Sequence, residues 1–349
     1  MREYRIGDPE LDGRLAALIH DAVEGHAEHG HDEELVAEML VSGLKMLRDD
    51  VDRGDLKLVN SALKEMRYSF LLFSRYKSIP KVTMYGSART PPDDPNYAFA
   101  SEFANRMADK HQWMIVTGAG PGIMEAGNRG AGRERGFGVN IRLPFEADAN
   151  EHVDSSRLIN FKYFFTRKLI FVKESDAFAL FPGGFGTQDE TFELLTLIQT
   201  GKSDMHPVVL IEAPGTGYWD AWLELVATLE KKGMISPDDS SLYLHTTDID
   251  EACREILGFY RNYHSQRYVD GRLVLRLKTV PTAALMARIN EEYADIVTSG
   301  VIESIEATPA EKADGDLVDL PRIRFTFDRR QHGRLRQLID VLNGSVPDE

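Results

Sequence analysis

The chain has 349 residues, enough for one large domain or two to three smaller ones. Its hydrophobic content of 42% and charged content of 28% are those of an ordinary soluble globular protein. The net charge of −15 argues against nucleic-acid and anionic-membrane partners, which require basic surfaces, so a phosphate site must be built locally.

The chain has a single cysteine, Cys253, so an internal disulfide is excluded, and such a composition is typical of a reducing compartment. Cys253 lies in an apparent helix, where we interpret it as a small buried apolar residue. No run of about 18 apolar residues occurs, so no membrane span is expected. Residues 1–13 lack the apolar core of a signal peptide. We therefore expect a cytoplasmic protein.

The first part of the chain, residues 1–79, is predicted to be a helical N-terminal extension. Apolar residues recur at helical spacing in two stretches, 35–47 and 56–70. Before them, four histidines alternate with acidic residues between positions 20 and 32. Because this segment is polar, contains glycine and lacks tight ligand spacing, we interpret it as a solvated loop or helix end rather than a metal site.

From Lys81 onward, short apolar strands alternate with amphipathic helices. This alternation predicts an α/β fold for residues 80–264, a doubly wound parallel sheet of the Rossmann-like type. Ligands of such sheets bind at the carboxyl ends of the strands, near the point where the strand order reverses. The predicted strands are 82–85, 113–117, 137–141, 177–181 and 208–211, and the predicted helices are 96–110, 121 onward, 163–174, 187–200, 218–231 and 248–263.

Residues 265–349 are predicted to form a small α+β C-terminal unit. The acidic stretch 311–319 is interpreted as a solvated loop. The predicted strands are 273–277, 301–307 and 323–327, and the predicted helices are 282–298 and 330–342.

The stretch 176–201 is predicted to be a strand, a glycine turn and a helix. Its turn, Pro-Gly-Gly-Phe-Gly-Thr at 182–187, allows positive φ and close approach of a ligand. Thr187 is predicted as the N-cap, and Glu190 follows three residues later, as in a capping box. Because free amides at a helix N-terminus attract anions, the turn predicts a phosphate cradle, with Asp189 and Glu190 on the first helical turn. A glycine turn with a purely capping glutamate is the alternative for this stretch alone.

Two further predicted strands end in glycine turns. The first continues as Tyr-Gly-Ser-Ala-Arg-Thr at 85–90, where Gly86 and Ser87 can offer an amide and a hydroxyl to phosphate or ribose. The second continues as Thr-Gly-Ala-Gly-Pro-Gly-Ile-Met-Glu at 117–125, and its glycines allow a nucleotide to lie against the backbone. The glycine spacing and the position after the second strand differ from the dinucleotide-binding fingerprint.

Two cations lie inside an aromatic helix start, Phe-Phe-Thr-Arg-Lys at 164–168. In one interpretation, the Arg167 and Lys168 side chains extend along the helix surface and place their charged ends in water. Because the protein is acidic and has three glycine turns at strand ends, we instead predict Arg167 as a site residue. Its planar donors match a carboxylate or a phosphate.

The chain resembles the Lonely Guy (LOG) family over roughly residues 80–262, in the motifs GSART, TGAGPGIMEA, FTRK and PGGFGTQDE. Members of this family long carried a lysine decarboxylase label. They are phosphoribohydrolases that cleave the N-glycosidic bond of nucleoside 5′-monophosphates, cytokinin ribotides included. Glu125 stands where many short members have glycine. Together with the two terminal extensions, it resembles the longer bacterial nucleotide-nucleosidase branch, which favours a general purine nucleotide over a cytokinin ribotide.

The resemblance implies hydrolysis of a nucleoside monophosphate such as AMP to free base and ribose 5-phosphate. Glu190 would stabilise an oxocarbenium-like transition state or activate water, and Arg167 would keep Glu190 ionised or bind substrate hydroxyls. Asp189 occupies a variable position of the motif and ranks lower. The expected substrate contacts are Gly86, Ser87, Gly118, Gly120, Met124, Glu125, Lys168, Pro182, Gly183, Gly184, Gly186 and Thr187.

No cofactor or metal is expected, because no lysine has the context of a Schiff base. The alternative function is a non-catalytic carrier or sensor of a nucleotide or phosphorylated cofactor, which would not need Arg167 with Glu190. The family resemblance also implies a homo-oligomer, at least a dimer, and the apolar helix after the cradle permits a dimer seam. By fold-level analogy alone, a regulatory nucleotide is expected at residues 266–349.

Overall fold

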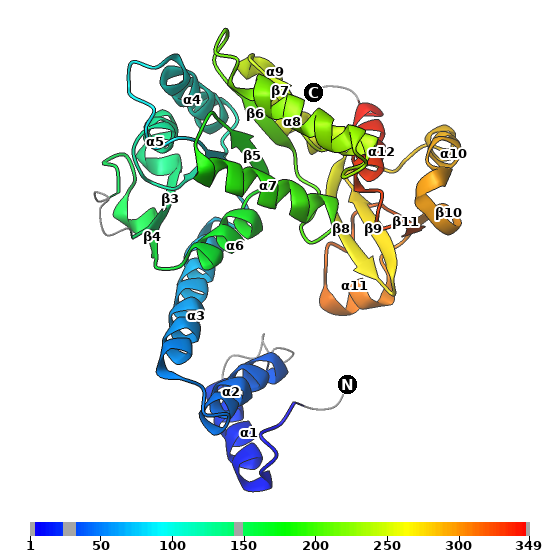
Figure 1. Cartoon of the computed structure of the whole chain (residues 1–349). Helices are drawn as coiled ribbons and strands as arrows, with labels where there is room; N and C mark the ends of the chain where they lie inside the picture. Colours follow the sequence, from blue (N-terminus) through cyan, green and yellow to red (C-terminus); the bar gives the residue numbers. More distant parts are fainter. Residues whose placement is uncertain (1–3, 24–32, 143–148, 347–349) are drawn as a thin grey trace. The chain divides into compact units, whose positions relative to one another are not determined.

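The structure, a computed structural model, describes residues 4–23, 33–142 and 149–346 (Figure 1). The chain divides into two compact units between Arg67 and Tyr68. The division at 79/80 and 264/265 expected from the sequence stays a prediction.

In the N-terminal unit, helices form where the apolar periodicity predicts them. They are α1 (Pro9–Val23), α2 (Glu33–Arg48) and α3 (Arg53–Phe73), whose last residues belong to the second unit. Most of the histidine-rich segment, residues 24–32, lies outside the described residues. Within the described ranges, no group of three or more His, Cys, Asp or Glu side chains could hold a metal ion. Nor does any helix of those ranges have the length and apolar character needed to cross a membrane.

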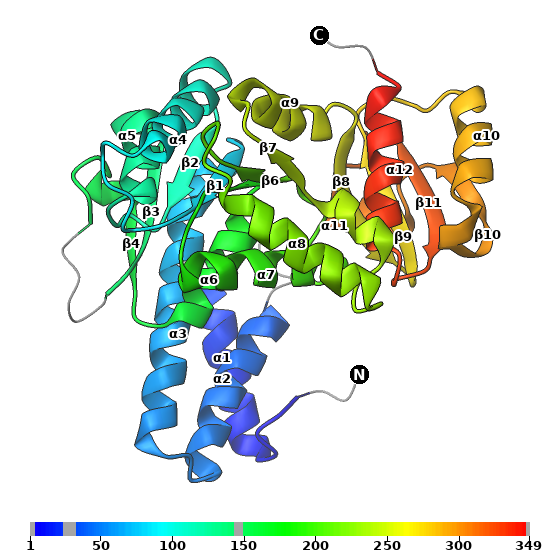
Figure 2. The ribbon, with the colours of Figure 1, turned by 45° about the horizontal axis from the view of Figure 1, so that its top comes forward.

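The second unit contains a seven-stranded parallel sheet with the strand order β4-β3-β2-β1-β5-β6-β7, which confirms the predicted fold class (Figures 1 and 2). The central strands are buried along their whole length and largely apolar, because helices cover both faces of the sheet. β1 pairs with both β2 and β5, so the strand order reverses at β1. The strands are β1 (Lys81–Tyr85), β2 (Met114–Thr117), β3 (Gly136–Ile141), β4 (Leu158–Phe161), β5 (Ala177–Leu180), β6 (Val208–Ile211) and β7 (Leu244–Thr246).

Each face of this sheet has its own buried apolar cluster. On one face the cluster includes Phe103 and Cys253, and on the other it includes Phe171 and Trp219. The first cluster is covered by α4 (Pro95–Asn105), α5 (Ile123–Arg135) and α9 (Ile249–Phe259), and the second by α6 (Phe164–Glu174), α7 (Phe185–Gln199) and α8 (Tyr218–Lys231) (Figure 2). In an arrangement of this kind, the loops at the carboxyl ends of the strands can form a site.

The sequence analysis missed the two outermost strands, β4 and β7. Each is short and only partly buried, so its sequence lacks the continuous apolar run of a central strand. The predicted helix 248–263 is too long, because α9 ends at Phe259 and Tyr263 begins the next strand. Likewise, the helix predicted over 282–298 ends at Glu292.

The C-terminal part of the second unit is a four-stranded antiparallel sheet with the order β10-β11-β9-β8. The β8–β9 hairpin turns at Asp270 and Gly271, which both have positive φ, as a two-residue type I′ turn requires. The elements are β8 (Tyr263–Val269), β9 (Arg272–Leu277), α10 (Ala283–Glu292), β10 (Val297–Ile305), α11 (Pro309–Asp314), β11 (Arg322–Phe327) and α12 (His332–Gly344).

The interpretation of residues 311–319 as a solvated loop is wrong for residues 311–314, whereas residues 315–319 are a loop that is mostly exposed. The segment includes most of α11, which begins with a capping box between Thr308 and Glu311. Glu311 is fully buried and forms ion pairs with Arg276 and Arg322. Glu311 therefore serves charge pairing with the sheet, while Asp314 and Asp316 pair with Arg267 at the surface.

Candidate functional site

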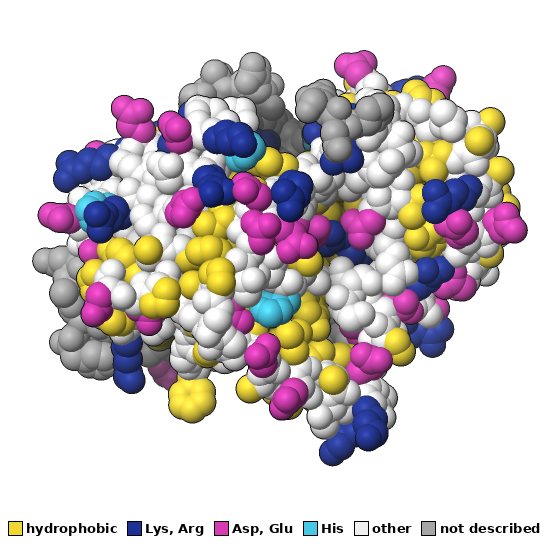
Figure 3. All heavy atoms as spheres, turned by 90° about the horizontal axis from the view of Figure 1, so that it is seen from above, with side chains coloured by type: hydrophobic (Ala, Val, Ile, Leu, Met, Phe, Trp, Pro, Cys, Tyr) yellow, Lys and Arg dark blue, Asp and Glu magenta, His cyan; other side chains and the backbone are white. Residues whose placement is uncertain are grey.

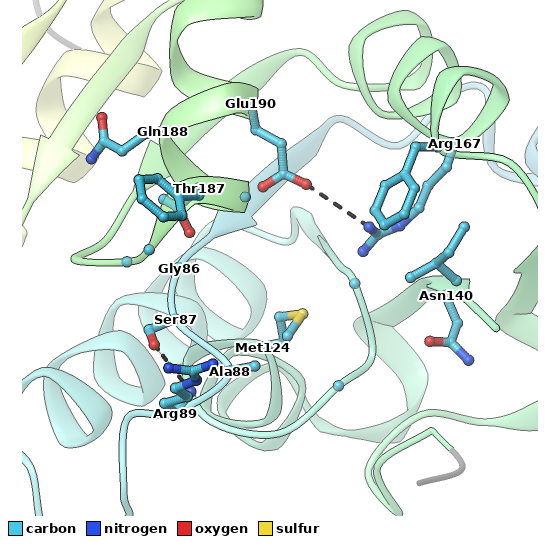
Figure 4. A pocket seen from close by; sticks show the side chains of 18 residues that line it. Gly86, Ser87, Ala88, Arg89, Met124, Asn140, Arg167, Thr187, Gln188 and Glu190 are labelled. Carbon is cyan, nitrogen blue, oxygen red and sulfur yellow. Dashed lines mark hydrogen bonds and ion pairs between the residues drawn. The ribbon is translucent and has the colours of Figure 1, made fainter. Parts of the chain in front are cut away.

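A cavity of about 670 Å³ opens at the carboxyl ends of the central strands, where the strand order reverses (Figure 4). Both its position and its size are typical of ligand sites in α/β proteins. The lining residues are Gly86, Ser87, Ala88, Arg89, Gly118, Gly120, Met124, Asn140, Ile141, Phe164, Arg167, Gly183, Gly184, Phe185, Gly186, Thr187, Gln188 and Glu190.

Three of the expected substrate contacts are not among these lining residues: Glu125, Lys168 and Pro182. The Lys168 ammonium lies 3.0 Å from a carboxylate oxygen of Asp189 and 2.9 Å from one of Glu193. The carbonyl of Pro182 accepts a hydrogen bond from the Ser87 amide and so joins the first and third glycine turns. The substrate contacts expected of these three residues stay predictions.

Several lining residues were not singled out from the sequence. Arg89 lies within the first glycine motif, which could have pointed to it. Asn140 is the residue before the last one of β3, and Phe164 and Phe185 begin α6 and α7. Phe164 and Phe185 lie inside two of the quoted stretches, which could have pointed to them, whereas Asn140 lies in none and comes to the cavity only through the packing of the strand ends.

The glycines of the three turns allow close contacts that a side chain would prevent. A Cβ atom at Gly183 would collide with the Thr187 hydroxyl and lie 3.0 Å from the Ser87 amide nitrogen. A Cβ atom at Gly118 would collide with the Arg167 guanidinium. The turns can therefore approach one another, and Arg167, only because these residues are glycines.

Helix α7 begins earlier than the sequence analysis predicts, so Thr187 as N-cap is wrong. Gly184 is the N-cap and has extended backbone angles, Phe185 is the first helical residue, and no side chain caps this end. Thr187 therefore lies in the first turn and Glu190 in the second, which rules out the predicted capping box. The first amides of α7 keep their capacity to bind an anion.

Arg167 and Glu190 approach one another across the cavity, as Figure 4 shows. Arg167 Nη1 lies 4.0 Å from Glu190 Oε1, and the two side chains are only 9% and 15% exposed. The guanidinium is held by a 2.8 Å hydrogen bond from Nε to the Val139 carbonyl and stacks over the Phe171 ring. This arrangement brings together the two residues that the resemblance marks as catalytic.

Burial raises the pKa of Glu190 to about 7, because a charged carboxylate loses its hydration there. The positive charges of Arg167 and Lys168 lower this pKa, and the negative charges of Asp189 and Glu193 raise it. A carboxyl group with this pKa can accept or release a proton near neutral pH, as a general base or acid requires.

Fold and cavity define a Rossmann-like α/β protein with a cavity at the switch point of the sheet. Residues 120–256 match the family model described as "Possible lysine decarboxylase". "Probable cytokinin riboside 5'-monophosphate phosphoribohydrolase LOG6" of Arabidopsis thaliana is 41% identical over 71 residues, which cover 20% of this chain and 34% of that protein. "Probable cytokinin riboside 5'-monophosphate phosphoribohydrolase LOGL5" of Oryza sativa subsp. japonica is 28% identical over 153 residues, 42% of this chain and 60% of that protein. These matches confirm the resemblance to the LOG family, although the chain spans only about a third of the first relative's length.

Two solved structures of molybdenum-cofactor proteins resemble half of the chain weakly. The molybdenum cofactor carrier protein of Chlamydomonas reinhardtii is 20% identical at a TM-score of 0.36, covering 51% of this chain and 98% of that chain. The molybdenum cofactor binding protein of Rippkaea orientalis is 19% identical at a TM-score of 0.34, covering 50% of this chain and 93% of that chain. At these scores the likeness carries no argument about activity.

Proposed function

We propose that this protein hydrolyses the N-glycosidic bond of purine nucleoside 5′-monophosphates to free base and ribose 5-phosphate. The observation that carries this proposal is the buried pair of Glu190 and Arg167 beside the uncapped start of α7, in one cavity. The names of the LOG relatives support the substrate class, although the matched segments cover only part of each protein.

The glycine turn after β5 is the proposed site of the 5′-phosphate. Gly183, Gly184, Gly186 and Thr187 line the cavity at the uncapped N-terminus of α7, and Ser87 faces them from the turn after β1. Amides and hydroxyls can hold a phosphate without a cluster of lysines. Such a site suits a protein of net charge −15, in which basic side chains do not gather on the face drawn in Figure 3.

The proposed reaction breaks the bond between ribose C1′ and the base nitrogen. The electron pair of this bond leaves with the base, water adds its oxygen to C1′, and the Glu190 carboxylate accepts the proton of that water. The same carboxylate stabilises the positive charge that develops on the sugar. The proton then passes to the departing base, so Glu190 is ionised again. Arg167 supports this cycle because its charge lowers the pKa of Glu190.

The turn after β2 is the proposed site of the base and ribose. Gly118, Gly120 and Met124 line the cavity there, together with Asn140 at the end of β3. We place a general purine nucleotide here rather than a cytokinin ribotide, because Glu125 and the two extensions resemble the longer bacterial branch of the family.

Product analysis tests the proposal. Purified protein is incubated with AMP, GMP, CMP, a cytokinin ribotide and adenosine, and the released bases are separated by chromatography. We expect base release from monophosphates but not from adenosine, fastest with a purine. Glu190→Gln should lower the rate by a factor of about 10²–10⁴, because it removes the general base but keeps the shape of the side chain.

Asp189→Asn is the matched control, because Asp189 is the neighbouring carboxylate but is 65% exposed and does not line the cavity. Its rate should stay close to that of the wild type. Tight binding of AMP by the wild type without base release would instead support a nucleotide carrier or sensor, the alternative function.

The homo-oligomer, the regulatory nucleotide and the cytoplasmic location stay predictions. Of the α7 residues on which the expected dimer seam rests, Leu194 and Ile198 are buried, and Leu195 and Leu197 are half-buried. On α6, Phe165 and Leu169 are half exposed and leave an apolar surface that a second copy could cover.

A further inference from the structure

Tyr218, the first residue of α8, contacts the glycine turn at the proposed phosphate site. Its hydroxyl donates a hydrogen bond to the carbonyl oxygen of Gly183 and accepts one from Gln188 Nε2 at 2.7 Å. A carbonyl oxygen can only accept, so the single Tyr218 proton must go to Gly183. Gln188 must then be the donor in its bond to Tyr218, and the direction of both bonds is fixed.

The position of Tyr218 is set by the framework behind the turn rather than by the turn itself. Its amide donates a 2.6 Å hydrogen bond to Glu212 Oε2, a buried carboxylate that also accepts from the Thr216 hydroxyl at 2.6 Å. The Tyr218 ring packs edge-on against the fully buried Trp219, with the ring centres 5.0 Å apart. The hydroxyl is therefore held in place before any ligand binds.

This contact determines which way the peptide group between Gly183 and Gly184 faces. In a trans peptide the C=O and the following N–H point in opposite directions. Because the Gly183 carbonyl is held towards α8, the Gly184 N–H points away from α8. Because both glycines line the cavity, an N–H that points away from α8 is available to a ligand there.

Without such a contact the peptide would have more rotational freedom than one between residues with side chains. Both flanking residues are glycines, and a Cβ atom at Gly184 would meet nothing within 4 Å. A rotated peptide would turn a carbonyl oxygen towards the cavity, where it would repel a phosphate. We propose that Tyr218 is a positioning residue that keeps the Gly184 N–H directed at the 5′-phosphate, an inference that rests on the proposed function.

The test is Tyr218→Phe, which removes the hydroxyl but keeps the ring that packs against Trp219. Binding of AMP, ribose 5-phosphate, inorganic phosphate and adenosine is measured by calorimetry. We expect the affinity for the three phosphate-bearing ligands to fall about tenfold, as the loss of one well-placed hydrogen bond to an anion would give. The affinity for adenosine should not change, because adenosine lacks the phosphate.

Tyr243→Phe is the matched control. Tyr243 packs against Trp222 of α8, with ring centres 5.2 Å apart, but among the described hydrogen bonds its hydroxyl makes none to the glycine turn that Tyr218 contacts. The Tyr243→Phe variant should bind each of the four ligands with the affinity of the wild type. Gln188→Leu should weaken phosphate binding less than Tyr218→Phe, since the Tyr218 proton still reaches Gly183.

Two results would overturn the inference. Either the Tyr218→Phe variant binds AMP as tightly as the wild type, or its affinities for AMP and adenosine fall by the same factor. A wild-type protein that binds AMP but releases no base would refute the proposed hydrolysis and leave this binding test intact. A wild type without phosphate-dependent binding would refute both.

Discussion

Two buried glutamates in this protein have opposite electrostatic surroundings. Glu190 of α7 faces the cavity with one arginine at 4.0 Å, and burial raises its pKa to about 7. Glu311 of α11 lies against the four-stranded sheet with no exposed surface. Burial alone would also raise the pKa of Glu311, but hydrogen bonds from Thr308, Arg276 and Arg322 outweigh it and lower the pKa to about 2.

The difference lies in the number of donors that reach each carboxylate. Glu311 Oε1 accepts from Arg276 Nη2 at 2.8 Å and from Arg322 Nε at 3.2 Å. Its Oε2 accepts from the amide and hydroxyl of Thr308 at 3.0 and 2.9 Å. Glu190 has no comparable set of donors among the hydrogen bonds of the described residues, and its burial is offset by the charges of Arg167, 4.0 Å away, and Lys168 rather than by hydrogen bonds.

This comparison teaches how one residue type serves two purposes. A buried carboxylate with all its acceptor sites filled stays ionised and holds two elements together. A buried carboxylate with few donors keeps a pKa near neutrality, where it can exchange protons. Burial is common to both, so donor count decides between a structural and a chemical role.

The largest effect that we expect from a substitution at either glutamate is a loss of folding stability at Glu311. Glu311→Gln should lower the free energy of unfolding by about 3–5 kcal/mol, because it leaves Arg276 and Arg322 buried without their shared anion. Urea unfolding followed by circular dichroism measures this loss. Base release per folded molecule should stay unchanged.

Glu190→Gln is the counterpart, and at pH 8 it should not destabilise the protein, since it removes a carboxylate that is unfavourable to ionise. A loss of stability in Glu190→Gln as large as in Glu311→Gln would contradict the distinction between the two sites.

The next effect is on the pH dependence of the rate. Because the ionised form of Glu190 is the proposed base, kcat for AMP should fall about tenfold per pH unit below about 7 and level off above it. Lys168→Met should move this inflection to higher pH, because the Lys168 charge lowers the pKa of Glu190, and Asp189→Asn should move it to lower pH. If none of these substitutions shifts the pH profile, the rate does not depend on the ionisation of Glu190.

Stability should depend on pH with opposite sign at the two sites. The raised pKa of Glu190 means that the folded state binds its proton more tightly, so this contribution falls as pH rises from about 4.5 to about 7. The lowered pKa of Glu311 means that its contribution is present above about 4.5 and is lost as pH falls towards about 2. Glu190→Gln should remove only the change in the free energy of unfolding between about pH 4.5 and 7, and Glu311→Gln only the change below about pH 4.5.

The smallest expected effect concerns Asp316, which accepts from Arg276 at 2.6 Å and from Arg267 at 2.9 Å but is 33% exposed. Asp316→Asn should lower the free energy of unfolding by about 1 kcal/mol, because water can replace part of each interaction. The same urea titration measures it. An effect as large as that of Glu311→Gln would show that the cluster depends on total charge rather than on the buried anion.

Much of the main sheet could be predicted, because its central strands and helices are written as local apolar patterns. The range predicted for α8, 218–231, is the range observed. The edge strands β4 and β7 were missed because partial burial removes the pattern. The start of α7 was misplaced because glycine, not Thr187, ends the turn.

The sequence by itself determined the alternating α/β order, the three glycine turns at strand ends, and the presence of Glu190 and Arg167, since these depend on residue type and spacing. Only the tertiary structure decided that Arg167 is held by Val139 and reaches Glu190, and that Glu311 is buried beneath two arginines. The physical reason is that a carboxylate's pKa depends on burial and on donors from distant parts of the chain. No local pattern distinguishes Glu190 from Glu311 before the chain folds.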